Sequence, residues 1–188
     1  MIVSLSGKPG SGKSTVAKKL ASAIGYERVY IGRIRREAAR KRGMTLAEFN
    51  AWSETHPEGD TEFDKRLEHI GKTKDNVIIE GRTAFHFIPH SLKIFLDISI
   101  EEGAQRIWNS IQETDAAERN EGSKLTSYEA VLDNVKQRIQ SDNTRYQKYY
   151  QLDIFDKRHY DFFLDTTTLD PDDEFQRVYD FVRSKLRQ

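Results

Sequence analysis

The sequence predicts an α/β fold in which helices cover both faces of a parallel β-sheet. Short apolar runs typical of strands alternate along the chain with amphipathic stretches typical of helices. The run at 77–79 is apolar at every position, as expected of a strand buried on both faces. The first run, at 2–5, leads through a glycine-rich loop into a helix, the arrangement in which such a loop binds phosphate.

The first half of the chain supplies most of the helix signals. A helix is expected at about 12–24, where apolar residues recur at helical spacing and a glycine ends the run. A short strand at 29–31 is followed by a basic helix at about 33–42. Residues 45–48 form a capping box that opens another short helix, and a further helix is expected at about 60–70.

The second half returns to strands. The next expected strand is at 92–97, and a second capping box at 99–102 begins a helix. A third capping box at 126–129 opens a long helix. A final strand is expected at 162–164, and Asp170 with a proline after it begins the last helix.

We expect residues 1–188 to form a single domain, because no repeat or linker divides them. Two helical segments are longer than a crossover needs, and both leave the carboxyl ends of strands, where open α/β sheets bind ligands. The polar stretch 112–124 has no apolar periodicity, which favours a mobile loop or lid. The expected division is a core of 1–32, 71–108 and 151–188, a helical segment at 33–70, and a lid segment at 109–126 followed by a long helix at 127–150.

Composition excludes several classes of protein. Lys plus Arg and Asp plus Glu number 30 each, so no overall charge attracts nucleic acid or an anionic membrane. The absence of cysteine excludes disulfides, zinc–thiolate sites and thiol nucleophiles. No apolar run reaches membrane-spanning length, and Met1 leads directly into a strand rather than a signal peptide. We therefore expect a cytoplasmic protein without nucleic-acid or membrane partners, and we expect it to be a monomer.

The glycine-rich loop is the strongest functional signal in the chain. It follows the pattern G-x-x-x-x-G-K-S and comprises Gly7, Lys8, Pro9, Gly10, Ser11, Gly12, Lys13, Ser14 and Thr15. Its glycines let backbone N–H groups wrap a phosphate, and the next helix directs its positive dipole end to the same place. Lys13 is expected to reach the outer phosphates of a nucleoside triphosphate, and Ser14 to ligate Mg²⁺. The alternative is a glycine-rich turn with a chance lysine, which the order of strand, loop and helix disfavours.

Glu80 and Arg82 directly follow the buried strand, at the edge of the sheet where ligands bind. A carboxylate at Glu80 is suited to hold Mg²⁺ through water. Phosphoryl transfer requires the charge on the transferred group to be neutralised, so Arg82 is a candidate catalytic residue. The alternative is that both residues only pair with neighbours at a strand end.

Arg138, Asp142 and Arg145 share one face of the predicted long helix. Alone, this trio fits an exposed ion-pair ladder of little energetic value. Because the helix follows the polar stretch, we expect instead a lid that closes the arginines over phosphates and excludes water.

A cluster of basic residues lies on the helix predicted at 33–42. Its members are Arg33, Arg35, Arg36, Arg40, Lys41 and Arg42. A nucleic-acid patch is one interpretation, but six charges spread around one helix are expected to be mostly solvated. One or two of them are then free to hold a second phosphate at the edge of the sheet.

Together these motifs resemble the cytidylate kinases among the nucleoside monophosphate kinases, most closely their short archaeal-type form. The resemblance runs nearly from end to end. Besides the phosphate loop, it rests on residues 32–37, 42–46, 56–64, 79–82, 88–89, 93–96 and the long helix with Arg138, Asp142, Arg145 and Tyr146. It implies the P-loop nucleoside monophosphate kinase fold, a five-stranded parallel sheet in the order 2-3-1-4-5 with helical monophosphate-binding and lid segments.

Carried over by position, the resemblance implies roles for the arginines. Arg36 and Arg82 would hold the acceptor monophosphate, and Arg138 and Arg145 would stabilise the transferred phosphoryl group. Arg106 lies where these kinases stack an arginine on the adenine of ATP.

The resemblance also implies roles for acidic residues. Asp142 would position a sugar hydroxyl or an arginine. The segment 33–70 would bind the monophosphate, with Asp60, Asp64 and Arg66 as candidates for recognising cytosine.

The chain departs from the family pattern in three places. Thr83 stands where the bacterial enzymes place an aspartate that contacts the base, although the archaeal-type form also lacks that aspartate. Residues 85–87 differ from the small and aromatic residues expected there, and the segment 109–126 is longer than the compact archaeal-type lid. None of these departures affects the phosphate-binding residues.

The sequence therefore predicts an ATP-dependent phosphotransferase that uses Mg²⁺ and converts CMP or dCMP into (d)CDP and ADP. No general base is needed, because the acceptor phosphate oxygen is already an anion near neutral pH. UMP, AMP and a small-molecule alcohol are alternative acceptors, although two arginines suit an acceptor that already carries phosphate. A non-kinase ATP-dependent switch or binding protein is the other alternative, and it would need a water-positioning residue for which we find no clear candidate.

Overall fold

The computed structural model describes residues 1–113 and 125–186. Its elements, in chain order, are β1 (Ile2–Gly7), α1 (Lys13–Ile24), β2 (Glu27–Tyr30), α2 (Ile31–Lys41), α3 (Leu46–Ser53), α4 (Glu58–Thr73), β3 (Val77–Glu80), α5 (Ala84–Phe87), β4 (Leu92–Asp97), α6 (Ile100–Glu113), α7 (Tyr128–Tyr150), the 3₁₀ turn η2 (Lys157–His159), β5 (Phe162–Asp165) and α8 (Pro171–Leu186).

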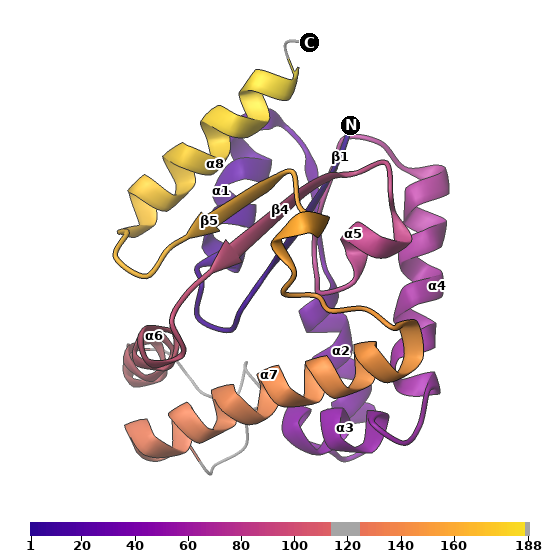
Figure 1. Ribbon diagram of the computed structural model, residues 1–188, viewed down its shortest axis with the longest axis vertical. Helices are drawn as coiled ribbons and strands as arrows, with labels where there is room; N and C mark the ends of the chain where they lie inside the picture. Colours follow the sequence, from indigo (N-terminus) through magenta and orange to yellow (C-terminus); the bar gives the residue numbers. More distant parts are fainter. Residues whose placement is uncertain (114–124, 187–188) are drawn as a thin grey trace.

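The five strands form one parallel sheet in the order β2-β3-β1-β4-β5 (Figure 1). This confirms the predicted α/β class and strand order. β1 pairs with both β3 and β4, and every residue of it is buried. The phosphate loop therefore leaves from the centre of the sheet.

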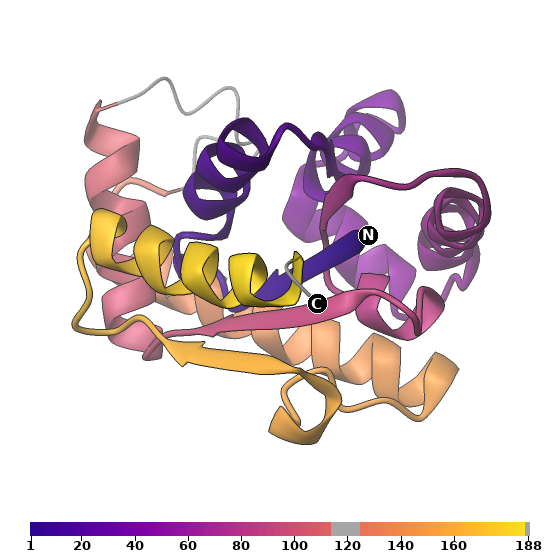
Figure 2. The ribbon, with the colours of Figure 1, turned by 90° about the horizontal axis from the view of Figure 1, so that it is seen from above.

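Helices cover both faces of this sheet, as predicted. On one face α1 and α8 pack over β1 and β4, with Leu5, Leu20 and Val178 in a common core (Figure 2). On the other face α4 and α5 pack against β1 and β3. Within the described residues, no helix combines the length and apolarity needed to span a membrane.

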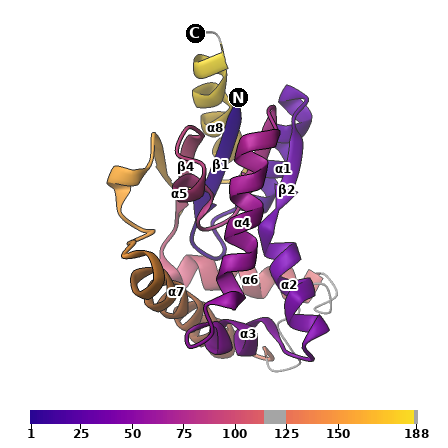
Figure 3. The same ribbon diagram turned by 90° about the vertical axis from the view of Figure 1, so that its right-hand side faces the viewer.

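The remaining helices gather at the carboxyl end of the sheet. In Figures 1 and 3, α2, α3, α6 and α7 lie together at the end opposite the amino terminus. α7 packs along α6 and also contacts α3. Helices from two distant segments of the chain therefore meet over the ends of the strands.

The first turn of α6 packs directly on the phosphate loop through two glycines. A Cβ added at Gly103 would lie 2.6 Å from the Pro9 carbonyl oxygen, and one added at Gly10 would lie 2.3 Å from the Gly103 carbonyl oxygen. Real Cβ atoms do not approach so closely, so this contact exists only because both residues are glycine. α6 thus sets the position of the loop, a role of Gly103 that no local pattern in the sequence indicates.

Several predicted boundaries are wrong. α2 begins at Ile31 rather than at residue 33, because the extended Tyr30 already acts as its N-cap. α6 runs to Glu113, so residues 109–113 of the predicted lid segment are helical; Ile107 and Ile111 continue its apolar stripe against α7. The rest of the predicted lid, 114–124, lies outside the described residues. The four-residue α5 is too short to show helical periodicity and was not predicted.

Two of the three predicted capping boxes differ in detail. The box at 45–48 is complete, with Thr45 accepting from the Glu48 N–H and the Glu48 carboxylate accepting in return. Ser99 accepts from the Glu102 N–H at 3.2 Å, but its own N–H donates to Thr167 instead. At α7 the cap is Ser127, one residue later than predicted. At the start of α6 a tertiary contact replaces a local one, whereas the start of α7 keeps a local cap that is shifted by one residue.

Substitution of Gly103 by alanine should weaken triphosphate binding. The new Cβ collides with backbone of the phosphate loop, so the loop must move, at a cost of about 1–3 kcal/mol in unfolding free energy. Gly43→Ala is the matched control: its φ of +69° makes alanine unfavourable, but nothing lies within 4 Å of the new Cβ. Calorimetric titration with ATP should show weaker binding in the first variant only; equal affinities would contradict the role of Gly103.

Candidate active site

A cavity of about 1220 Å³ opens at the carboxyl ends of the strands. The phosphate loop from Pro9 to Thr15 forms one part of its wall. The charged residues that line the rest are Arg33, Arg36, Glu37, Arg40, Asp60, Asp64, Glu80, Arg82, Glu102, Arg106, Arg138, Asp142 and Glu174, together with Arg35. The β3 end, the helical segment after β2 and the helices α6, α7 and α8 therefore face one space.

Lys13 lies at the centre of the phosphate loop. Its ammonium donates to the Lys8 carbonyl and to Ser11 Oγ, so it is held within the loop. Burial lowers the pKa of Lys13, and the charge of Arg82 lowers it further. A phosphate group bound here would favour the ammonium and reverse this shift, which suits the loop to an anion.

Ser14 and Glu80, the two predicted Mg²⁺ contacts, lie in hydrogen-bond contact. The Ser14 hydroxyl donates to Glu80 Oε1, while Arg28 of β2 donates to Glu80 Oε2. A hydroxyl and a carboxylate are oxygen donors that suit Mg²⁺, which keeps several waters and phosphate oxygens in its shell. No group of three or more His, Asp or Glu able to hold a metal occurs in residues 1–113 and 125–186. The pair therefore fits a metal that is brought in with phosphates.

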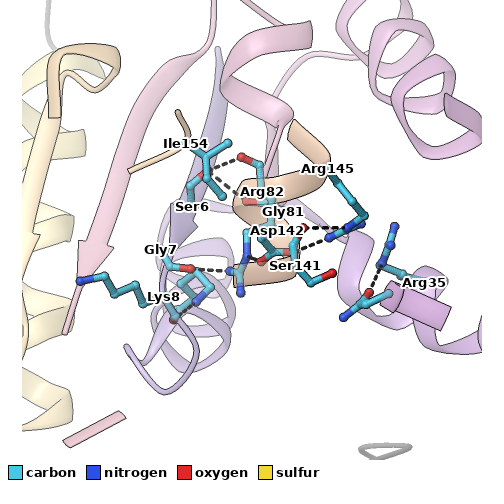
Figure 4. Close-up of polar contacts among 12 residues, drawn as sticks. Ser6, Gly7, Lys8, Arg35, Gly81, Arg82, Ser141, Asp142, Arg145 and Ile154 are labelled. Carbon is cyan, nitrogen blue, oxygen red and sulfur yellow. Dashed lines mark hydrogen bonds and ion pairs between the residues drawn. The ribbon is translucent and has the colours of Figure 1, made fainter. Parts of the chain in front are cut away.

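Arg82 joins the sheet to α7 and to the phosphate loop (Figure 4). Its Nε donates to Asp142 Oδ2 at 2.8 Å, and its guanidinium also donates to the Gly7 carbonyl. Burial opposes ionisation of Asp142, but the charges of Arg82 and Arg145 outweigh it and lower the pKa of this carboxyl. Asp142 is therefore ionised and holds Arg82 at the edge of the cavity.

Arg145 lies beneath the cavity and does not line it. Its side chain is fully buried, donating to both carboxylate oxygens of Asp60 at 2.8 and 2.9 Å and to Asp142. Asp60 also accepts from Arg35 of α2 at 2.7 Å. Three helices, α2, α4 and α7, are thus joined through one buried carboxylate.

Arg36 of the basic cluster faces the cavity and donates to the Tyr30 hydroxyl at 2.7 Å. Arg66 is exposed and does not line the cavity. The inward face of α4 carries Asp60, Asp64 and Leu67, and helical geometry turns Arg66 away from it.

Asp64 lines the cavity with partners from two other elements. Thr83 Oγ1 donates to its Oδ1 at 3.0 Å, and the Tyr150 hydroxyl at the end of α7 donates to its Oδ2. Burial raises the pKa of Asp64 to about 6, although these hydrogen bonds lower it. Tyr150 was not predicted as a site residue, since nothing local to it in the sequence points to Asp64.

Arg106 is fixed at the end of the cavity formed by α6 and α8. Its guanidinium donates to the carbonyls of Thr166 and Leu169 at 2.7 and 2.8 Å and pairs with Glu102 and Glu174. Because acceptors occupy the edges of the Arg106 guanidinium, its flat face is the part that can stack on a planar ring. Sequence reasoning missed Glu174, which reads as an ordinary acid in the first turn of a helix.

The structure thus brings most of the predicted site residues to one cavity. Those whose side chains line it include Lys13, Ser14, Glu80, Arg82, Arg138 and Asp142. The Lys8 side chain instead pairs with Asp97 at 2.7 Å, away from the loop. Lys8 and Gly7 contribute through their carbonyls, which accept from Lys13 and Arg82.

Comparison with known proteins gives the family. The model of the cytidylate kinase-like family matches residues 2–168. A protein named cytidylate kinase from Pyrococcus furiosus is 38% identical over 95% of this chain and 86% of its own length. Its namesake from Halobacterium salinarum is 36% identical over 97% of this chain and 89% of its own.

The chain belongs to the cytidylate kinase-like family. Solved structures support the fold at much lower sequence identity. A shikimate kinase from Bacteroides thetaiotaomicron superposes with a TM-score of 0.63 at 14% identity, covering 97% of this chain and 98% of its own. An uncharacterised protein from Eubacterium ventriosum gives a TM-score of 0.69 at 16% identity, covering 98% and 99%. The chain therefore shares its fold with a shikimate kinase.

Removal of one charge from the buried network should destabilise the protein strongly. Asp60→Asn leaves the buried Arg145 and the partly buried Arg35 with a neutral amide in place of their shared carboxylate, which should lower the unfolding free energy by about 3 kcal/mol or more. Asp172→Asn removes an exposed partner of Lys19 and should leave stability nearly unchanged. Urea unfolding of both variants measures this difference in stability, and equal midpoints would contradict the stabilising role of Asp60.

Proposed function

We propose that this member of the cytidylate kinase-like family transfers the γ-phosphate of ATP to CMP or dCMP, giving ADP and (d)CDP. One observation carries the proposal. The phosphate loop and a separate set of arginines, Arg36, Arg82 and Arg138, line the same cavity. Two phosphate-binding regions in one open cavity suit a donor and an acceptor that both carry phosphate.

On the donor side, the phosphate loop holds the triphosphate and Lys13 contacts its outer phosphates. The face of the Arg106 guanidinium stacks on the adenine, while Glu174 and the carbonyls of Thr166 and Leu169 keep it in place. Ser14 and Glu80 would hold Mg²⁺, which would supply charge neutralisation on the phosphates.

On the acceptor side, Arg36 and Arg82 hold the monophosphate. Its anionic oxygen attacks the γ-phosphorus of ATP without a general base, and ADP leaves. Arg138 neutralises charge on the transferred phosphoryl group. Arg145 supports the site from below by holding Asp142 and Asp60, rather than by lining the cavity. Asp142 orients Arg82, one of the two roles that the resemblance implies for it.

The base is recognised by Asp64. Its carboxylate accepts a hydrogen bond from the exocyclic amine of cytosine, a donor that uracil lacks. The relatives named cytidylate kinase support a cytosine nucleotide as acceptor. Asp60 forms ion pairs with Arg35 and Arg145, so we propose that it positions these arginines and does not contact the base. We propose no role for Arg66. The cytoplasmic location and monomeric state stay predictions.

A coupled assay of ADP release across a panel of monophosphates tests the proposal. CMP and dCMP should give turnover well above that of UMP, AMP, shikimate or no acceptor. Turnover that is equal with and without an acceptor would favour the ATP-dependent switch. A preference for another acceptor would overturn the assignment of the base.

Arg82→Ala should lower kcat/KM for CMP by about two to three orders of magnitude, because one charge-stabilising donor is typically worth about 3–4 kcal/mol. The control is Arg158→Ala, since Arg158 is exposed and pairs only locally with Asp156. Steady-state kinetics with each substrate varied checks the role. A loss confined to ATP affinity would mean that Arg82 serves the donor.

A further inference from the structure

Asp64, Thr83 and Tyr150 form a polar cluster built from three separate parts of the chain. Asp64 lies on α4 and is 6% exposed, Thr83 follows β3, and Tyr150 is the last residue of α7. Each donor occupies a different oxygen of the carboxylate. Because a carboxylate oxygen has two lone pairs, each oxygen keeps one acceptor position for a ligand in the cavity that Asp64 lines.

This cluster explains two of the departures from the family pattern. Thr83, at one of these positions, donates its hydroxyl hydrogen to a carboxylate that comes from a different helix. The rings of Phe87 and His86 lie 5.3 and 6.1 Å from the Tyr150 ring and pack against it. The unusual α5 residues therefore fix the tyrosine that in turn orients Asp64.

We propose that Tyr150 is a positioning residue that holds the Asp64 carboxylate for the base, and that the protonation state of Asp64 sets the choice between cytosine and uracil. The proposal rests on the proposed function and deepens it. An ionised carboxylate accepts from the exocyclic amine of cytosine and repels the O4 carbonyl of uracil. A protonated carboxyl group has an O–H that donates to the uracil O4.

The surroundings of Asp64 place the pKa of its carboxyl group within the pH range of a kinetic assay. Burial raises its pKa to about 6; the hydrogen bonds from Tyr150 and Thr83 lower it, the Asp60 charge raises it, and Arg35 lowers it. The other titratable and charged groups that face this cluster are Arg145 on Asp60, Tyr146 in the cavity wall and His86 beside Tyr150. Cytosine should be preferred above about pH 6 and the preference should fade below it.

The ratio of kcat/KM for CMP to that for UMP, measured from pH 5 to pH 8, tests this proposal. A phosphate monoester ionises near pH 6 itself, but this affects both acceptors alike and cancels in the ratio. With a pKa near 6, the ratio of ionised to protonated Asp64 is about 100 at pH 8 and about 0.1 at pH 5. Because the ionised form accepts CMP and the protonated form accepts UMP, the kcat/KM ratio should fall by up to about a thousandfold from pH 8 to pH 5. Asp64→Asn should lower the ratio and remove its pH dependence.

Tyr150→Phe tests the positioning role. Loss of a hydrogen bond to a charged group should raise KM for CMP about tenfold, with kcat retained. The acidic limb of the CMP profile should move to higher pH, because the carboxylate loses a stabilising donor. Tyr149→Phe is the matched control: the neighbouring hydroxyl donates to the Ser53 carbonyl at 2.8 Å, and Tyr149 does not line the cavity.

The possible failures are distinguishable. A CMP:UMP ratio that stays constant over this pH range, with CMP still a good acceptor, overturns the protonation proposal and leaves the kinase activity intact. Equal KM and pH profiles for Tyr150→Phe and Tyr149→Phe overturn the positioning role. Absence of turnover with either pyrimidine monophosphate overturns the proposed function and with it this inference. Should Tyr150→Phe not fold, the wild-type ratio still decides the protonation proposal, and Tyr150→His tests the positioning role, because its ring N–H can donate to Asp64 in place of the hydroxyl. A KM for CMP near that of the wild type is then expected, and a KM raised about tenfold or more in a folded Tyr150→His variant overturns the positioning role.

Discussion

A chain of buried ion pairs holds the helical segments to the sheet. Arg35 and Arg145 share Asp60, and Arg145 and Arg82 share Asp142. Arg82 also donates to the Gly7 carbonyl, where the phosphate loop begins. The helices α2, α4 and α7 and the end of β3 therefore depend on one network, in which Arg35, Asp60, Arg82 and Asp142 line the cavity and Arg145 lies behind its wall.

The balance of this network suits it to an anionic ligand. Three guanidinium groups meet two carboxylates, so a positive charge is left over at the floor of the cavity. The buried Lys13, whose pKa is lowered by burial and by Arg82, adds to this positive potential. Phosphates entering the cavity would neutralise charge that the fold has already assembled, without reorganisation of the protein.

Local signals in the sequence predicted local structure well. Apolar runs located all five strands, and the complete capping box at Thr45 has its predicted partner. Prediction failed where a distant residue competes with a local one. The Ser99 N–H donates to Thr167 rather than to Glu102, so the second capping box is incomplete. The four residues of α5 are too few for periodicity to reveal.

The sequence by itself determined the phosphate loop, the α/β class and, through the family resemblance, the strand order, because these depend on neighbours in the chain or on a shared pattern. Only the tertiary structure decided which charged residues face the ligand. Arg145 and Asp142 are neighbours on one helix face, yet Arg145 is buried beneath the cavity and Asp142 lines it. Asp64, Thr83 and Tyr150 meet from three elements. Such contacts depend on how helices pack over the sheet, which no spacing along the chain encodes.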